Sequence, residues 1–208
     1  MEGKSICEVF REFVGRVLSA HGFELRGPHL AERRSRGLRQ GILLRTEGSG
    51  EDVWAYVGTY SVFTHELDDG PAPGRLTTTN VVAGVCPGEM GSREDGLLST
   101  LKMTMDILLP ELNRYSTVDA IVRDVEKYPG SSAHLLGDSS VSNTFNHAYC
   151  LENVGRLQDA RKLYRDTAER LAQVDGALAR KYSAAATRRA AALDEVRKAS
   201  QSQSKAEL

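Results

Sequence analysis

The chain has 208 residues, of which 40% are hydrophobic and 26% are charged, and its formal net charge is −1. These values are typical of a soluble globular protein, and they disfavour nonspecific nucleic-acid binding, which needs an excess of basic side chains. No apolar run approaches the roughly 20 residues required to span a bilayer, and the N terminus lacks the basic and apolar blocks of a secretory signal. We therefore expect a cytoplasmic protein without a membrane partner.

The charge is unevenly distributed along the chain. Residues 151–208 contain 12 basic and 8 acidic side chains, so residues 1–150 carry a net charge of −5. The sequence thus predicts a mildly acidic front part and a mildly basic, helical tail.

The N-terminal segment has the signals of a capped amphipathic helix. Ser5 and Glu8 have the spacing of a capping box, in which each side chain satisfies a backbone amide of the other residue. Apolar residues then recur at three-and-four spacing, which predicts one continuous buried face. Gly22 is suited to a left-handed stop after this helix.

A strand-rich segment follows the helix. Leu30–Ser35 and Leu38–Thr46 flank a plausible tight turn, and Val53–Phe63 is rich in β-branched and aromatic residues. These three segments predict an antiparallel meander. Thr77–Val85 is a candidate fourth strand.

Helical patterns dominate the rest of the chain. Gly96–Leu109 is predicted to be a helix that Pro110 ends or kinks. Ser116 or Thr117 is expected to cap a second helix that runs to about Tyr128. The last three predicted helices are Asn143–Val154, Leu157–Ala172 and Gly176–Ser200.

These elements predict an α+β fold, an antiparallel sheet covered by helices, followed by a C-terminal three-helix, tetratricopeptide-like module. The Ser- and Gly-rich segment Gly130–Ser142 is the expected boundary between the two parts. The predicted divisions are residues 1–129 for the α+β domain, 130–142 for a linker, 143–200 for the helical module and 201–208 for a disordered tail.

Three short motifs occur in the order found in a family of bacterial domains of unknown function, numbered 4304. They are His21-Gly22-Phe23 after the first helix, Trp54-Ala55-Tyr56-Val57-Gly58 in the last strand, and Leu109-Pro110-Glu111-Leu112 before the Ser116–Lys127 helix. Over about residues 5–128 the chain resembles this family, although its glutamine-bearing strand is matched only by Gln40-Gly41-Ile42. Because the family has no established activity, the resemblance implies a fold and a bacterial origin but no reaction.

The second part resembles a single tetratricopeptide hairpin. Gly155-x4-Ala160-x3-Tyr164 has the spacing of that repeat, and Ala148 and Leu151 fall where its first helix packs. No second copy follows at the repeat distance. We therefore expect the hairpin to pack on the front domain, on the third helix or on a partner.

Residues with catalytic chemistry are scattered. Cys7, Cys86 and Cys150 lie far apart without metal-like spacing, so we expect reduced and mostly buried thiols. The sequence contains no phosphate-binding glycine loop or nucleophile elbow, and no cofactor or metal is predicted. His65-Glu66 with Asp68-Asp69 is the one local cluster of potential ligands. It is interpreted as a solvated acidic loop, a partner-binding loop, or a metal or catalytic site.

The first hairpin carries four arginines. They are interpreted either as a solvated edge that discourages aggregation or as an anion or partner contact. The four residues are Arg33, Arg34, Arg36 and Arg39.

The leading functional hypothesis is a non-catalytic bacterial protein that binds another protein, in the form of an immunity or antitoxin-type protein that sterically blocks a toxin. Clustered carboxylates would steer a cationic partner, and a strand face rich in Trp and Tyr would anchor it unless helices bury that face. One alternative is a small enzyme with a loop site at residues 65–69, and another is a scaffold or regulator that binds a peptide in the helical hairpin. The predicted partner-binding residues are Trp54, Tyr56 and Tyr60 on the strand, Glu66, Asp68 and Asp69 in the loop, and Tyr149, Arg156 and Tyr164 in the helical groove.

Overall fold

The computed structural model has the predicted α+β class, with a four-stranded antiparallel sheet and a mostly helical C-terminal part. The contacts within the chain define two compact units, and each is described by itself. Unit 1 comprises Met1–Val62 and Pro71–Ser116, and unit 2 comprises Phe63–Gly70 and Thr117–Leu208. The structure describes residues 5–47, 54–65, 67, 93–131, 135–136 and 140–206.

Unit 1 begins with α1 (Ile6–Arg16), and the predicted capping box is confirmed. The Ser5 side chain accepts a hydrogen bond from the Glu8 amide, and the Glu8 carboxylate accepts one from the Ser5 amide at 2.7 Å. A short 3-10 turn, η1 (Leu18–His21), follows and ends at Gly22, whose φ of 79° is left-handed as predicted. The amphipathic sequence therefore folds into a helix with a defined start, a defined end and one apolar face.

The sheet of unit 1 has the strand order β1-β2-β3-β4. The strands β2 (Leu30–Ser35), β3 (Leu38–Glu47) and β4 (Trp54–Phe63) match the predicted meander to within one residue at each end. The edge strand β1 (Glu24–Gly27) was not predicted, because its four residues are too few for a clear alternation. The predicted strand Thr77–Val85 lies outside the described residues.

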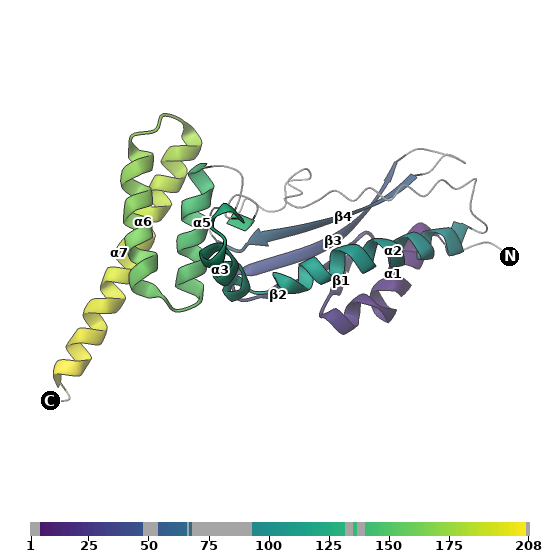
Figure 1. Cartoon of the computed structure of the whole chain (residues 1–208), viewed down its shortest axis with the longest axis horizontal. Helices are drawn as coiled ribbons and strands as arrows, with labels where there is room; N and C mark the ends of the chain where they lie inside the picture. Colours follow the sequence, from purple (N-terminus) through teal and green to yellow (C-terminus); the bar gives the residue numbers. More distant parts are fainter. Residues whose placement is uncertain are drawn as a thin grey trace. The chain divides into compact units, whose positions relative to one another are not determined.

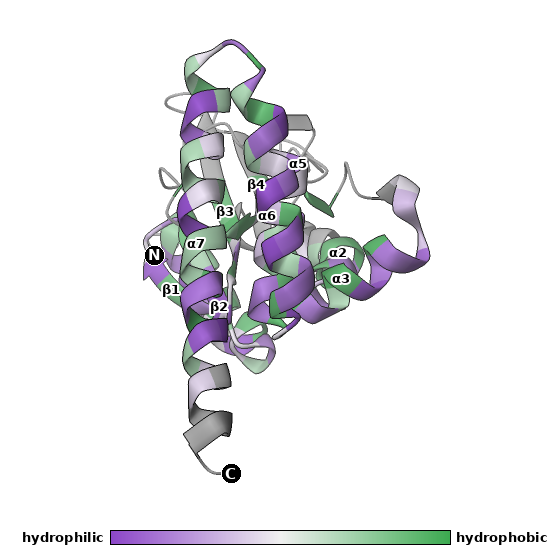
Figure 2. Ribbon diagram, turned by 90° about the vertical axis from the view of Figure 1, so that its left-hand side faces the viewer, coloured by the Kyte–Doolittle hydropathy of each residue, from purple (hydrophilic) through white to green (hydrophobic). Residues whose placement is uncertain are grey.

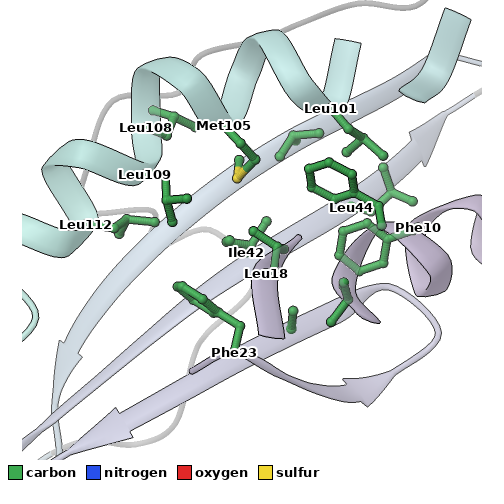
Figure 3. Close-up of a cluster of buried hydrophobic side chains, with 14 of the residues drawn as sticks. Phe10, Leu18, Phe23, Ile42, Leu44, Leu101, Met105, Leu108, Leu109 and Leu112 are labelled. Carbon is green, nitrogen blue, oxygen red and sulfur yellow. The ribbon is translucent and has the colours of Figure 1, made fainter. Parts of the chain in front are cut away.

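The core of unit 1 lies between the sheet and two helices, α1 and α2 (Arg93–Arg114). Figure 3 shows side chains from both helices converging on apolar residues of the strands. Each fully buried Leu or Phe contributes about 1.5–3 kcal/mol through removal of apolar surface from water. Members of this cluster include Phe10, Phe13, Leu18, Phe23, Ile42, Leu44, Leu101, Met105, Leu108 and Leu112.

Of the two predicted effects of Pro110, an end or a kink of the helix, the end is excluded, because α2 continues through Pro110 to Arg114. A proline inside a helix loses one backbone hydrogen bond and crowds the preceding turn. Here the pyrrolidine ring is exposed, while Leu109 and Leu112 on either side are buried against the sheet. Tertiary packing on both sides of Pro110 thus outweighs its local cost.

Unit 2 contains α3 (Val118–Lys127), α5 (Ser140–Asn153), α6 (Leu157–Ala172) and α7 (Ala177–Ala206). Thr117 caps α3, as predicted, by accepting a hydrogen bond from the Ala120 amide at 3.3 Å. Gly155 makes the turn between α5 and α6 with a φ of 85°. Figures 1 and 2 show α5, α6 and α7 side by side. Small buried side chains allow this close packing, namely Ala148, Ala160, Ala185 and Ala186.

Two segments near the predicted boundaries belong to the helices of unit 2. By its contacts α3 is part of unit 2, where it packs on α5, and the longer stretch of this unit begins at Thr117. The apolar face of α3 explains this, because Ile121, Val122 and Val125 are buried there. Residues 201–206 were predicted to be disordered but continue α7 to Ala206.

Candidate functional site

A buried polar cluster lies on the strands of unit 1, on the alternate residues that do not enter the apolar core. The register pairs Glu32 of β2 with Gly41 of β3, and Tyr60 of β4 reaches across Gly41 to the Glu32 carboxylate. The Tyr60 hydroxyl donates a hydrogen bond to Glu32 Oε1, and both side chains are about 4% exposed. The guanidinium groups of Arg34 and Arg39 lie 3.6 and 3.7 Å from the same carboxylate.

The chemistry of this cluster is that of a neutralised buried carboxylate. Burial, and then the bond to Glu32, raise the pKa of Tyr60 far above its ordinary value, so the phenol stays protonated and acts as a donor. A phenol held in this state is not available as a base or a nucleophile. The Tyr60 hydroxyl donates a hydrogen bond to Glu32 and the two arginines balance its charge, which lowers the cost of burying the carboxylate.

Of the two alternatives for this strand face, covered or presented to a partner, the structure has the Tyr60 side chain covered. Tyr60 does lie on the strand face that the alternation predicted, but its ring packs over Gly41 and its hydroxyl contacts Glu32. The side chains of Trp54 and Tyr56 lie outside the described part of the chain, as do Glu66, Asp68 and Asp69.

His65 of the predicted loop cluster anchors the chain to α5 after the end of β4. Its Nε2 lies 3.0 Å from Asn146 Oδ1, and the Leu67 amide donates to its Nδ1 at 3.2 Å. The Asn146 amide group in turn donates to the Leu136 carbonyl at 2.6 Å. The imidazole also meets the rings of Phe145 and Tyr149 edge-on, with centroids 5.2 Å apart in each case. These contacts give His65 a structural role within unit 2.

Tyr149 and Tyr164, which were predicted to line a binding groove, are both buried. The Tyr164 hydroxyl donates to the Glu152 carboxylate at 2.8 Å, and Arg189 of α7 donates to the same carboxylate at 3.0 and 3.1 Å. The Tyr149 hydroxyl donates to the Thr64 carbonyl at 3.0 Å. The sequence could not show that α7 and the chain after β4 cover these faces of the hairpin.

Among the predicted partner-binding residues whose side chains the structure describes, Arg156 is the exposed one. It begins α6, forms an ion pair with Glu126 of α3, and donates to Asp159 Oδ2 at 2.9 Å. The bonds to Glu126 and then Asp159 raise the pKa of its guanidinium. Arg156 thus ties the C-terminal end of α3 to the turn between α5 and α6.

Two exposed apolar side chains that were not predicted lie toward this end of unit 2. Leu157 follows Arg156 and is 38% exposed, and Val196 on α7 is 50% exposed. Asp194 is paired with Arg161 and Arg165 of α6 at 2.7 and 2.5 Å, which aligns this stretch of α7 with the first turns of α6. Leu157 and Val196 therefore lie at the same end of the α6–α7 pair, hereafter the open end.

The open end is also where α7 leaves its neighbours. Leu193 is the last buried residue that the structure gives in α7, and residues 195–200 are all exposed. Figures 1 and 2 show the final turns of α7 extending past the end of α6. A sequence signal could have indicated this surface. The predicted last helix is longer than its neighbour, and the apolar residues Leu193 and Val196 follow each other at helical spacing near its end.

His147 on α5 is within the electrostatic influence of Glu126 and Arg156, and its Nε2 is buried without a hydrogen-bond partner. Burial lowers the pKa of His147, and Glu126 opposes while Arg156 assists this shift. Because the unfolded chain takes up the proton near pH 6.5 and the folded chain only at lower pH, the unfolding free energy should fall as the pH drops below about 6.5.

This effect is testable by urea unfolding of the wild type and of His147→Gln, followed by circular dichroism at several pH values. Below pH 6.5 we expect the unfolding free energy of the wild type to fall by up to about 1.4 kcal/mol more per pH unit than that of the variant. This slope is the limit set by the uptake of one proton. The other histidines and the carboxylates contribute equally to both proteins. Parallel curves for the two proteins would contradict the assignment.

Among the described residues, no group of three or more His, Cys, Asp or Glu side chains is placed to hold a metal ion, and no helix there has the length and apolar character needed to cross a membrane. The chain matches no protein-family model, no curated protein and no solved structure.

Proposed function

We propose that the protein is a non-catalytic bacterial binding protein that uses the open end of unit 2 to hold another protein. The single observation that supports this proposal is the continuation of α7 beyond Leu193 with its side chains exposed. The segment of α7 after Arg197 is about two and a half helical turns long. Isolated helices of this length are marginal in water, so a contact with a partner would stabilise it.

The partner is a folded protein with an apolar contact surface and an acidic rim. Leu157 and Val196 provide the apolar centre. Arg156 directly precedes Leu157 in the chain, and arginine flanking apolar residues is a typical composition for the energetic centre of an interface. The last turns of α7, residues 195–206, contain three basic residues and one acidic residue, so acidic side chains around the partner's apolar surface would match them.

The specific form of the proposal is an immunity or antitoxin-type protein whose partner is a toxic enzyme, blocked sterically. In the described part of the chain, the groups with catalytic potential at the predicted sites are held in internal contacts, including Tyr60, His65 and Tyr164. This favours binding over catalysis. A peptide-binding scaffold is less favoured because Tyr149 and Tyr164 are buried.

The test is affinity capture from a lysate of the source organism with the tagged full-length chain, identification of the retained protein by mass spectrometry, and measurement of its Kd. The variant Leu157→Glu/Val196→Glu places charges in the apolar centre and should weaken binding at least tenfold. The matched control is Val174→Glu/Leu178→Glu at the opposite end of the α6–α7 pair, where the side chains are 43% and 47% exposed. The control should bind like the wild type.

Equal loss of binding in the two double variants, or no loss in either, would remove the open end as the binding surface. If the captured partner is an enzyme whose activity falls on stoichiometric addition of the wild type, the toxin-blocking form is supported. A partner whose activity is unchanged would limit the proposal to protein binding.

A further inference from the structure

A thiol and an imidazole meet near the start of α1. The Cys7 sulfur lies 3.7 Å from Nδ1 and 3.7 Å from Nε2 of His29, so either ring nitrogen can accept the thiol proton. His29 belongs to the turn between β1 and β2, and its carbonyl accepts a hydrogen bond from the Leu44 amide of β3 at 2.8 Å. The sheet thus fixes the imidazole beside Cys7.

Cys7 also lies close to the N terminus of its helix. Ser5 is the N-cap, so Cys7 lies in the first turn of α1, where backbone amides lack intrahelical acceptors and the helix dipole is positive. The nearest carboxylate on this turn, Glu8, is held on the backbone amide and hydroxyl of Ser5 at 2.7 and 2.8 Å. The Cys7 side chain is partly exposed, so small reagents have access to it.

Cys150 on α5 provides the contrast within the same chain. It is fully buried, and burial raises its pKa far above the ordinary value of a thiol. A thiol in this environment is inert, because the thiolate is the reactive form. The two described cysteines therefore differ in access and in the presence of a neighbouring base.

We propose that Cys7 is a modification site, a peroxide-reactive thiol with His29 as its base. His29 takes the thiol proton, and the sulfur attacks one oxygen of hydrogen peroxide. The O–O bond breaks, and the departing hydroxide takes the proton from the imidazolium to form water. The sulfur is oxidised to a sulfenic acid while the peroxide is reduced, and a cellular thiol can then displace water from the sulfenic acid to form a mixed disulfide.

The experiment uses the full-length chain with Cys86→Ser, so that the two described thiols are the ones measured. Hydrogen peroxide is added at pH 7, the sulfenic acid is trapped with dimedone, and the Cys7 and Cys150 peptides are quantified by mass spectrometry over time. We expect folded Cys7 to react on the order of tenfold faster than Cys7 of the urea-unfolded chain. Folded Cys150 should remain unmodified, which also verifies that the protein is folded.

His29→Gln keeps a polar side chain of similar size but removes the base. It should lower the folded Cys7 rate at least fivefold and leave the rate in urea unchanged. Iodoacetamide, which needs the thiolate but no leaving-group protonation, provides a second readout and should show the same order of rates. The proposal is overturned if folded Cys7 reacts no faster than unfolded Cys7, or if His29→Gln leaves the folded rate unchanged.

Discussion

Gly41→Ala should destabilise unit 1 by about 3 kcal/mol or more, although it adds a single methyl group. A Cβ at this position would lie 2.2 Å from Cζ and 2.5 Å from the hydroxyl oxygen of Tyr60, distances at which the ring must move. Displacing the ring exposes buried aromatic surface and removes the hydroxyl that satisfies the Glu32 carboxylate. Urea unfolding followed by the fluorescence of Trp54, the single tryptophan, measures the effect.

The control for a general glycine effect is Gly15→Ala on α1, where an added Cβ meets nothing within 4 Å. It should be neutral or stabilising by about 0.5–1 kcal/mol, because alanine favours the helix. A double-mutant cycle with Tyr60→Ala isolates the steric term. Gly41→Ala should cost little in that background, and an equal cost in both backgrounds would show that the Tyr60 ring is not the cause.

Arg33→Met should destabilise unit 1 by about 3 kcal/mol, because four acceptors lose their donor together. Arg33 donates to the carbonyls of His21 and Leu112 at 3.0 and 2.6 Å, and to the side chains of Gln40 and Asn113 at 2.9 and 2.7 Å. The guanidinium also lies over the Phe23 ring, 4.6 Å from its centroid, and burial lowers its pKa. One side chain thus joins the ends of η1 and α2 to the sheet.

Arg33→Lys tests whether charge or geometry matters. An ammonium group cannot reproduce the planar fork that reaches both carbonyls, so most of the loss should persist in the lysine variant. Arg36→Met in the exposed β2–β3 turn is the matched control and should change the unfolding free energy by less than about 0.5 kcal/mol. Full stability of Arg33→Lys would mean that the charge alone is sufficient.

Arg33 also illustrates what a local sequence pattern cannot distinguish. Four arginines on one hairpin were interpreted as a solvated edge or a partner contact, and the alternation of β2 does place Arg33 and Arg34 on opposite faces. Arg33 shares its face with Gln40, whose amide donates to the Ser61 hydroxyl and the Tyr115 carbonyl. Its buried role arises from residues 79 and 80 positions away, which no short window contains.

The candidate sites also separate what local sequence indicates from what long-range packing decides. Arg156 is exposed at the open end, because it lies in a helix-initiating turn that can be read locally. Tyr60, Tyr149 and Tyr164 lie on the strand and helices where the sequence placed them, and the structure buries all three side chains. Which face of an amphipathic element is covered depends on the elements that pack against it, and here those are α7 and residues distant in the chain.

The sequence by itself determined the local elements of this protein: the capped first helix, the meander, the Thr117 cap and the α5–α6 hairpin turned at Gly155. Each depends on side chains and backbone preferences within a few residues. Only the tertiary structure decided that α2 passes through Pro110, that α3 joins the helical unit, and that three predicted contact tyrosines are buried. In each case packing between distant segments contributes more free energy than local preference, because burial of apolar surface and satisfaction of buried polar groups outweigh propensities of about 1 kcal/mol per residue.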